Sequence, residues 1–137
     1  MIGKKILIYG LGKSGVSSFI FLKKNNLVKC YDDNKIKNKT FKRSLIKKEK
    51  IYKVNFDFIL ISPGINIDNC GLKTFLSKNR KRIITDFDIF FMLNKQNTAI
   101  TVTGTNGKST TVKLLHLILK KVFKDVRLCG NIGNPIL

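Results

Sequence analysis

Apolar residues occur along the chain in two alternating patterns. Short, nearly continuous apolar runs are typical of strands buried in a parallel sheet, whereas apolar residues that recur every three or four positions are typical of helices. The two patterns predict strands at residues 4–9, 27–31, 56–61, 82–85, 98–102 and 125–129, and helices at residues 16–24, 41–48, 71–79, 86–93 and 112–119. Asp86 is expected to cap the fourth helix. This alternation of strands and helices predicts the α/β class with parallel sheets.

A glycine-rich turn follows the first expected strand directly. Gly10, Gly12 and Gly15 form the pattern GxGxxG, and the acids Asp32 and Asp33 end the next expected strand, 17 and 18 residues after Gly15. This combination is typical of Rossmann-like domains, in which the turn approaches a diphosphate and the acid a ribose. A tight strand-to-helix turn that binds no ligand is the alternative.

A further turn follows the third expected strand, in the sequence Ser62-Pro63-Gly64-Ile65. Pro63 fixes one backbone angle and Gly64 frees the next, so the chain can turn sharply there. The turn is expected at the carboxyl end of the sheet, where ligands of open α/β folds bind, but taken alone it indicates little about function.

A second glycine-rich loop connects the fifth expected strand with the last expected helix. Gly104 and Gly107 allow the backbone to approach an anion closely, and the start of the helix favours negative charge. Lys108 is expected to reach the outer phosphates of a nucleotide, and Ser109 to offer its hydroxyl to Mg²⁺. The general P-loop pattern has a glycine where this chain has Val102, so the loop is a shortened variant. A chance glycine turn before an ordinary helix is the alternative.

The strong positive charge is the most unusual bulk property. The 137 residues include 27 Lys+Arg and 8 Asp+Glu, a net charge of +19, which is compatible with nucleic-acid binding. The basic residues are mostly lysine, occur in every segment and accompany an excess of Ile, Asn and Phe. A genome-wide compositional bias with solvated lysine faces therefore explains the charge better, and no specific nucleic-acid partner is expected.

Cysteine usage and hydropathy exclude several other classes. The three cysteines, Cys30, Cys70 and Cys129, are far apart and accompany a single histidine, so neither a disulfide framework nor a zinc site is expected. No apolar run reaches the roughly 18 residues that span a bilayer. The first glycine-rich turn also interrupts an N-terminal apolar segment that superficially resembles a signal peptide. We therefore expect a cytoplasmic protein without membrane insertion.

Five motifs, taken in order, resemble those of the Mur ligases of bacterial cell-wall synthesis. The resemblance covers the whole chain. The motifs are Gly10-Leu11-Gly12-Lys13-Ser14-Gly15, Ser62-Pro63-Gly64-Ile65, Asp86-Phe87-Asp88-Ile89-Phe90, the loop from Gly104 to Thr110, and Gly130-Asn131-Ile132-Gly133. The loop from Gly104 to Thr110 is typical of Mur ligases and of the similar folylpolyglutamate synthases, whereas the first, second and last motifs favour the branch that adds D-glutamate.

The resemblance implies two domains and a role for each motif. Residues 1–93 are expected to form a Rossmann-like domain that binds the uridine diphosphate of the substrate without a redox cofactor. After a linker at residues 94–97, residues 98–137 are expected to begin the central ATP-binding domain, of P-loop ATPase type. The implied substrate-binding residues are Lys13 and Ser14 at the diphosphate, Asp32 near the uracil or ribose, Gly64 against the nucleotide, and Asn131 near the sugar. The implied ATP-binding residues are Gly104, Thr105, Asn106, Gly107, Lys108, Ser109 and Thr110, with Lys108 as the catalytic residue on the phosphates and Ser109 on Mg²⁺.

The implied reaction is ATP-dependent amide-bond formation. ATP phosphorylates the terminal carboxylate of UDP-N-acetylmuramoyl-L-alanine, and the amine of D-glutamate attacks the acyl phosphate, chemistry that relies on positioning and charge neutralisation. Full-length members of the family have three domains and are about three times longer. The chain is therefore expected to be a truncated gene product, a gene fragment or one piece of a split enzyme whose missing domains lie on a complementing chain. We expect it to be inactive alone, and we expect the segment from Thr98 onward either to expose apolar surface or to pack irregularly against the first domain.

Two other functional classes stay open. An NAD-dependent oxidoreductase would use the first glycine-rich turn, but it leaves Lys108 and its loop unexplained. The other class is a non-catalytic module that binds nucleotides or polyanions, which stays open because the chain is expected to lack most of the ligase.

Overall fold

The computed structural model describes residues 1–34, 36, 39–130 and 134–137. It divides into two compact units: unit 1, which is Met1–Leu93 together with Leu137, and unit 2, which is Asn94–Ile136. Within the described part of the chain, none of the helices has both the length and the apolar character needed to cross a membrane.

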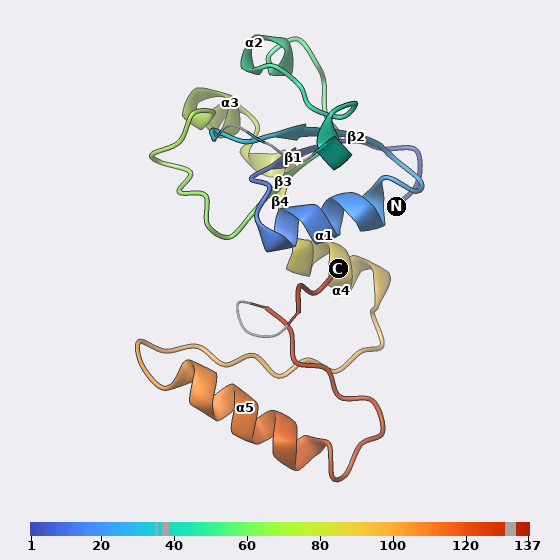
Figure 1. The fold of residues 1–137 in the computed structure, drawn as a ribbon, viewed down its shortest axis with the longest axis vertical. Coiled ribbons are helices and arrows are strands. Elements are labelled where there is room, and N and C mark those ends of the chain that lie inside the picture. The colour runs from blue at the N-terminus through green and yellow to red at the C-terminus, as the bar shows by residue number, and fades with distance from the viewer. Residues whose placement is uncertain (35, 37–38, 131–133) are drawn as a thin grey trace. The chain divides into compact units, whose positions relative to one another are not determined.

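The described residues of unit 1 form a four-stranded parallel sheet, in the spatial order β2-β1-β3-β4 (Figure 1). Its strands are β1 (Lys5–Tyr9), β2 (Leu27–Tyr31), β3 (Phe58–Ile61) and β4 (Ile83–Ile84). The register places Tyr9 beside both Tyr31 and Ile61, so β1, β2 and β3 end together at one edge of the sheet. The predicted α/β class with a parallel sheet is confirmed for unit 1.

Helices cover both faces of this sheet (Figure 1). One face carries α1 (Lys13–Leu22) and α4 (Asp86–Leu93), and the other carries α2 (Lys48–Ile51) and α3 (Lys73–Lys78). Two short 3₁₀ helices complete the unit, η1 (Lys39–Phe41) and η2 (Arg80–Arg82).

Strand β1 is central because its side chains enter both hydrophobic cores. Successive side chains of a strand point to opposite faces. Ile6 and Ile8 therefore pack in the core under α1, with Phe19, whereas Leu7 and Tyr9 pack in the core under α3. These four side chains of β1 are completely buried, which explains why the strand after Lys5 is an uninterrupted apolar run.

The ends of several helices and the cap of α4 differ from the prediction. Helix α1 begins at Lys13, not at residue 16, since the last glycine of the GxGxxG pattern lies inside its first turn. Helix α4 begins at Asp86 as expected, but the capping side chain is that of Thr85. The Asp88 carboxylate accepts the Thr85 N–H at 2.7 Å, and the Thr85 hydroxyl accepts the Asp88 N–H at 3.2 Å, which is the reciprocal arrangement of a capping box.

The helix predicted at residues 41–48 is wrong. The chain is extended at Leu45, which forms an isolated parallel bridge with Cys30 at the edge of β2. The Cys30 N–H donates to the Ser44 carbonyl at 2.8 Å, and the Ile46 N–H donates to the Cys30 carbonyl at 3.0 Å. Phe41 is buried against Phe19, with ring centroids 5.0 Å apart. These tertiary contacts override the helical preference of a lysine-rich segment.

Unit 2 contains one regular element among its described residues, helix α5 (Lys108–Leu119), which includes the helix predicted at residues 112–119 and begins four residues before it. The strands predicted at residues 98–102 and 125–129 are wrong: the first region is irregular, and the second forms only an isolated bridge between Cys129 and Asn134. Isolated strands are unstable without partners that complete a hydrophobic face. Ile100 is accordingly 57% exposed, and α5 has no buried residue.

Candidate functional site

The first glycine-rich turn lies at the carboxyl edge of the sheet, between β1 and α1. Gly10 has a φ of +91°, a conformation that favours glycine, and its N–H donates to the Tyr31 carbonyl at 2.9 Å. A Cβ on Gly15 would collide with the Gly10 carbonyl, so this glycine lets α1 pack directly on the turn. Gly12 precedes the helix in extended conformation and caps it without a side chain. The first amides of α1 are therefore available to an anion.

Asp32 fixes the shape of this turn from the end of β2. One carboxylate oxygen accepts the Leu11 N–H at 2.7 Å, and the other accepts the Asn34 N–H at 2.9 Å. The family resemblance implies that Asp32 lies near the uracil or ribose, and the structure places its carboxylate against the backbone of the glycine turn. A carboxylate has lone pairs beyond these two bonds, so the two roles are compatible.

The turn after β3 lies beside the first turn. The Ser62 hydroxyl is buried and donates to the Gly10 carbonyl at 2.7 Å, and the Ser62 N–H donates to the Tyr9 carbonyl at 3.0 Å. Gly64 follows and is exposed, with no atom within 4 Å of the position that a Cβ would occupy. Lys13 is exposed and Ser14 half-buried at the start of α1. The structure thus brings four of the five implied substrate-binding residues to one edge, and Asn131 lies outside the described residues.

A second acid, Asp33, forms contacts that were not expected from the sequence. The hydroxyl of the buried Tyr9 donates to the Asp33 carboxylate. The Gly71 N–H donates to the same carboxylate at 3.1 Å. Burial and then the hydrogen bond to Asp33 raise the pKa of Tyr9 well above its ordinary value. Burial acts to raise the pKa of Asp33, but the hydrogen bonds from Tyr9, Gly71 and Tyr31 outweigh it and hold that pKa below its usual range. The sequence could have indicated this contact, because Tyr9 ends a buried strand and a buried hydroxyl needs a hydrogen-bond partner.

The second glycine-rich loop belongs to unit 2 and immediately precedes α5. Gly107 caps the helix in the left-handed conformation, with a φ of +75°, and Gly104 has a φ of +149°. The Lys108 ammonium folds back on the loop and donates to the carbonyls of Gly104 and Thr105, the latter at 3.1 Å. All residues from Gly104 to Thr110 are exposed. A phosphate can therefore reach the loop, where it would replace these carbonyls as the partner of the ammonium.

The residues around this loop fit Mg²⁺ only in part. Ser109 supplies a hydroxyl next to Lys108, but the described residues contain no group of three or more His, Cys, Asp or Glu side chains that could hold a metal ion. Mg²⁺ commonly keeps several waters and binds through phosphate oxygens with only one or two protein ligands. The loop thus fits a metal that arrives with the nucleotide.

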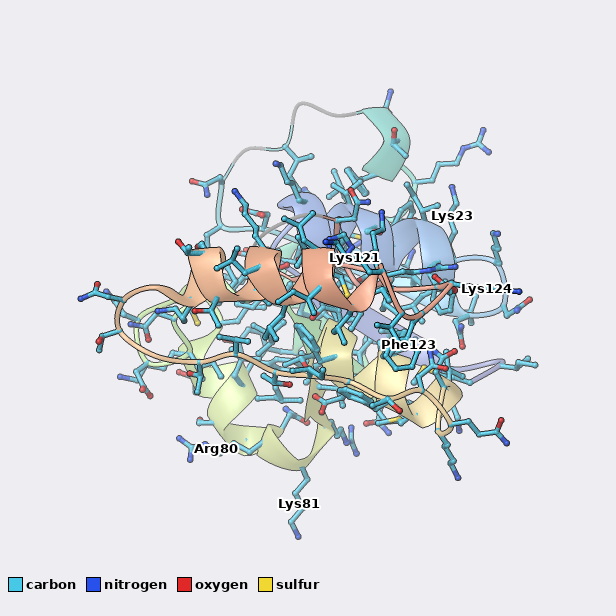
Figure 2. The ribbon with its side chains drawn as sticks, turned by 90° about the horizontal axis from the view of Figure 1, so that it is seen from below. Lys23, Arg80, Lys81, Lys121, Phe123 and Lys124 are labelled. Carbon is cyan, nitrogen blue, oxygen red and sulfur yellow. The ribbon has the colours of Figure 1, made fainter. Side chains whose placement is uncertain are left out.

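The exposed basic side chains in Figure 2 belong to separate elements. In unit 1, Lys23 follows α1 and lies 5.2 Å from the centre of the Phe19 ring, whereas Arg80 and Lys81 extend outward from η2. In unit 2, Lys121 and Lys124 follow α5. Scattered lysines of this kind are typical of a solvated surface.

Comparison with known proteins identifies relatives along the whole chain. A protein of Caldicellulosiruptor saccharolyticus named UDP-N-acetylmuramoylalanine--D-glutamate ligase is 35% identical, over 100% of this chain and 33% of its own length. Proteins with the same name from Rickettsia bellii and Buchnera aphidicola are 36% and 40% identical, over 98% of this chain and 31% and 32% of theirs. The chain resembles the N-terminal part of these Mur ligases. The resemblance expected from the five motifs is thereby confirmed.

The extent of the match limits what the relatives imply. The chain spans about a third of the length of the curated ligases it matches. No protein-family model matches it. The chain therefore resembles these ligases over their N-terminal third, and the remaining two thirds of each ligase have no counterpart in the match.

Proposed function

We propose that unit 1 binds the uridine diphosphate part of UDP-N-acetylmuramoyl-L-alanine and that unit 2 begins the ATP-binding domain of the same ligase. The observation that carries this proposal is the geometry of the carboxyl edge of the sheet. There the glycine turn, the open start of α1 and the turn after β3 meet at one place. Such an edge is where open parallel sheets bind nucleotides.

Each implied substrate-binding group at this edge has a role in the proposal. The Lys13 ammonium, the Ser14 hydroxyl and the first amides of α1 bind the diphosphate, because a helix start and a cation both favour negative charge. Asp32 holds the turn and accepts a hydrogen bond from the ribose or the uracil. The exposed backbone at Gly64 lies against the nucleotide. A contact of Asn131 with the sugar is proposed from the family resemblance alone, since this residue lies outside the described part of the chain.

Unit 2 contributes the nucleotide loop in this proposal. Lys108 and the backbone amides between Gly104 and Thr110 bind the phosphates of ATP, and Ser109 binds the accompanying Mg²⁺. Bound Mg²⁺ and ATP supply charge neutralisation and the phosphoryl group that activates a carboxylate. The complete ligase then joins D-glutamate to UDP-N-acetylmuramoyl-L-alanine for peptidoglycan synthesis in the cytoplasm. This whole reaction uses parts of the ligase that lie beyond the matched third.

Isothermal titration of the chain with UDP-N-acetylmuramoyl-L-alanine, ATP and NAD tests the proposal. We expect UDP-N-acetylmuramoyl-L-alanine to bind and NAD not to bind. A Lys13→Ala variant should bind the UDP ligand about tenfold more weakly, since a charge-assisted hydrogen bond contributes about 1.5–3 kcal/mol. Lys24→Ala is the matched control, because Lys24 lies beyond the other end of α1. Binding of NAD without binding of the UDP ligand would refute the proposal and favour the oxidoreductase.

A further inference from the structure

The carboxylate of Asp33 connects three segments of unit 1. Asp33 follows β2, Tyr9 ends β1, and Gly71 ends the loop that leads from β3 to α3. The Tyr9 hydroxyl donates to one oxygen of the Asp33 carboxylate, and the Gly71 N–H donates to the same oxygen at 3.1 Å. Tyr9 is completely buried, so its hydroxyl acts inside the protein and cannot reach a ligand.

Gly71 is required for this close approach. A Cβ at this position would collide with the Asp33 carboxylate, so any other residue would push the loop and the acid apart. Hydrogen bonds that donate to an ionised carboxylate are about twice as strong as neutral ones. The contact between Asp33 and Gly71 therefore fastens the end of the loop firmly to β2.

The beginning of the same loop is fastened to the glycine turn. The Ser62 hydroxyl donates to the Gly10 carbonyl at 2.7 Å. Ile65 also packs against Gly10, with its Cγ1 atom 3.0 Å from the position that a Cβ would occupy there. Residues 62–71 are thus held at one end by the turn after β1 and at the other end by Asp33. The exposed Gly64 lies between the two attachments.

We propose that Asp33 is a positioning residue for the uridine nucleotide: it holds residues 62–71 beside the glycine turn, so that the backbone at Gly64 is placed before the nucleotide arrives. This inference rests on the proposed function of unit 1. The two consecutive acids then have different roles, since Asp32 holds the glycine turn in place and Asp33 holds the loop after β3. An ordered loop binds more tightly because less conformational entropy is lost on binding.

Isothermal titration calorimetry with UDP tests the inference on three variants of the chain. We expect Asp33→Ala to bind UDP about tenfold more weakly and Tyr9→Phe about threefold more weakly. The double variant should bind little more weakly than Asp33→Ala alone, because the Tyr9 hydroxyl donates to Asp33 and acts mainly through that carboxylate. Asp68→Asn is the control, since it removes an equal charge from an exposed position of the same loop. Circular dichroism verifies that each variant is folded.

The Gly71 amide gives a second, independent signal. In ¹⁵N-resolved NMR spectra its proton resonance should move upfield in Asp33→Ala, because the amide loses its carboxylate acceptor. Wild-type UDP affinity in Asp33→Ala, with the Gly71 signal shifted, would overturn the inference and leave the proposed function intact. Weaker binding by Asp33→Ala with unchanged binding by Tyr9→Phe would overturn it in favour of direct ligand contact by Asp33. Absence of UDP binding by the wild-type chain would overturn both.

Discussion

Replacing Gly15 with alanine is expected to lower the free energy of unfolding by about 2 kcal/mol. Alanine favours a helix interior by up to about 1 kcal/mol, but inserting an atom into a close-packed contact typically costs 1–3 kcal/mol and occasionally more. Here the added Cβ would collide with the Gly10 carbonyl and lie 3.0 Å from the Ser62 hydroxyl. The backbone carbonyl cannot yield as a flexible side chain can, so α1 must move away from β1. Chemical denaturation followed by circular dichroism measures the change.

Gly12→Ala is the matched control for this variant. Gly12 has a φ of −70° and no atom within 4 Å of an added Cβ, so the substitution changes only the helix cap. We expect it to cost less than about 1 kcal/mol. A Gly15→Ala variant as stable as the wild-type chain would contradict the close packing of α1 on the glycine turn.

Replacing Lys108 with alanine is expected to weaken ATP binding at least about tenfold. The ammonium already donates to two carbonyls of its own loop, so it is held where the phosphates are proposed to bind. Removing a charge-assisted hydrogen bond costs about 1.5–3 kcal/mol, which corresponds to roughly 10- to 150-fold in affinity. Titration of the chain with MgATP measures this loss.

Lys113→Ala provides the comparison for Lys108→Ala. Lys113 is exposed on the same helix but beyond its first turn, so the variant removes an equal charge away from the loop. Its ATP affinity should stay within about twofold of the wild-type value, since exposed charges are screened by salt. Equal losses in the two variants would show that ATP responds to net charge alone and not to the loop.

The elements predicted well from the sequence are those whose signal is local. Strand β1 and helix α4 were predicted within one residue because their hydrophobic patterns have the period of the element they form. The glycine turn between β1 and α1 was predicted from its glycines and from the elements on either side. Helix α5 follows directly from the apolar spacing after Lys108.

The elements predicted wrongly depend on partners that are distant in the sequence. Residues 98–102 have the composition of a strand, but no described segment of unit 2 pairs with them. Leu45 lies among residues whose types favour a helix, but its backbone pairs with that of Cys30. The contact of Asp33 with Gly71 joins residues 38 positions apart, so no local pattern predicts it. The Asp32–Asp33 pair showed that acids end β2, but only the fold assigns each acid to a different loop.

The central claim is that the glycine turn of unit 1 binds the diphosphate of a uridine nucleotide. It is tested most directly by ¹⁵N-resolved NMR of the chain during titration with UDP. We expect saturable shifts of the backbone amides from Leu11 to Gly15 and at Gly64, with the amides of α3 unchanged. UDP that leaves the amides from Leu11 to Gly15 unshifted at saturating concentration would contradict the claim.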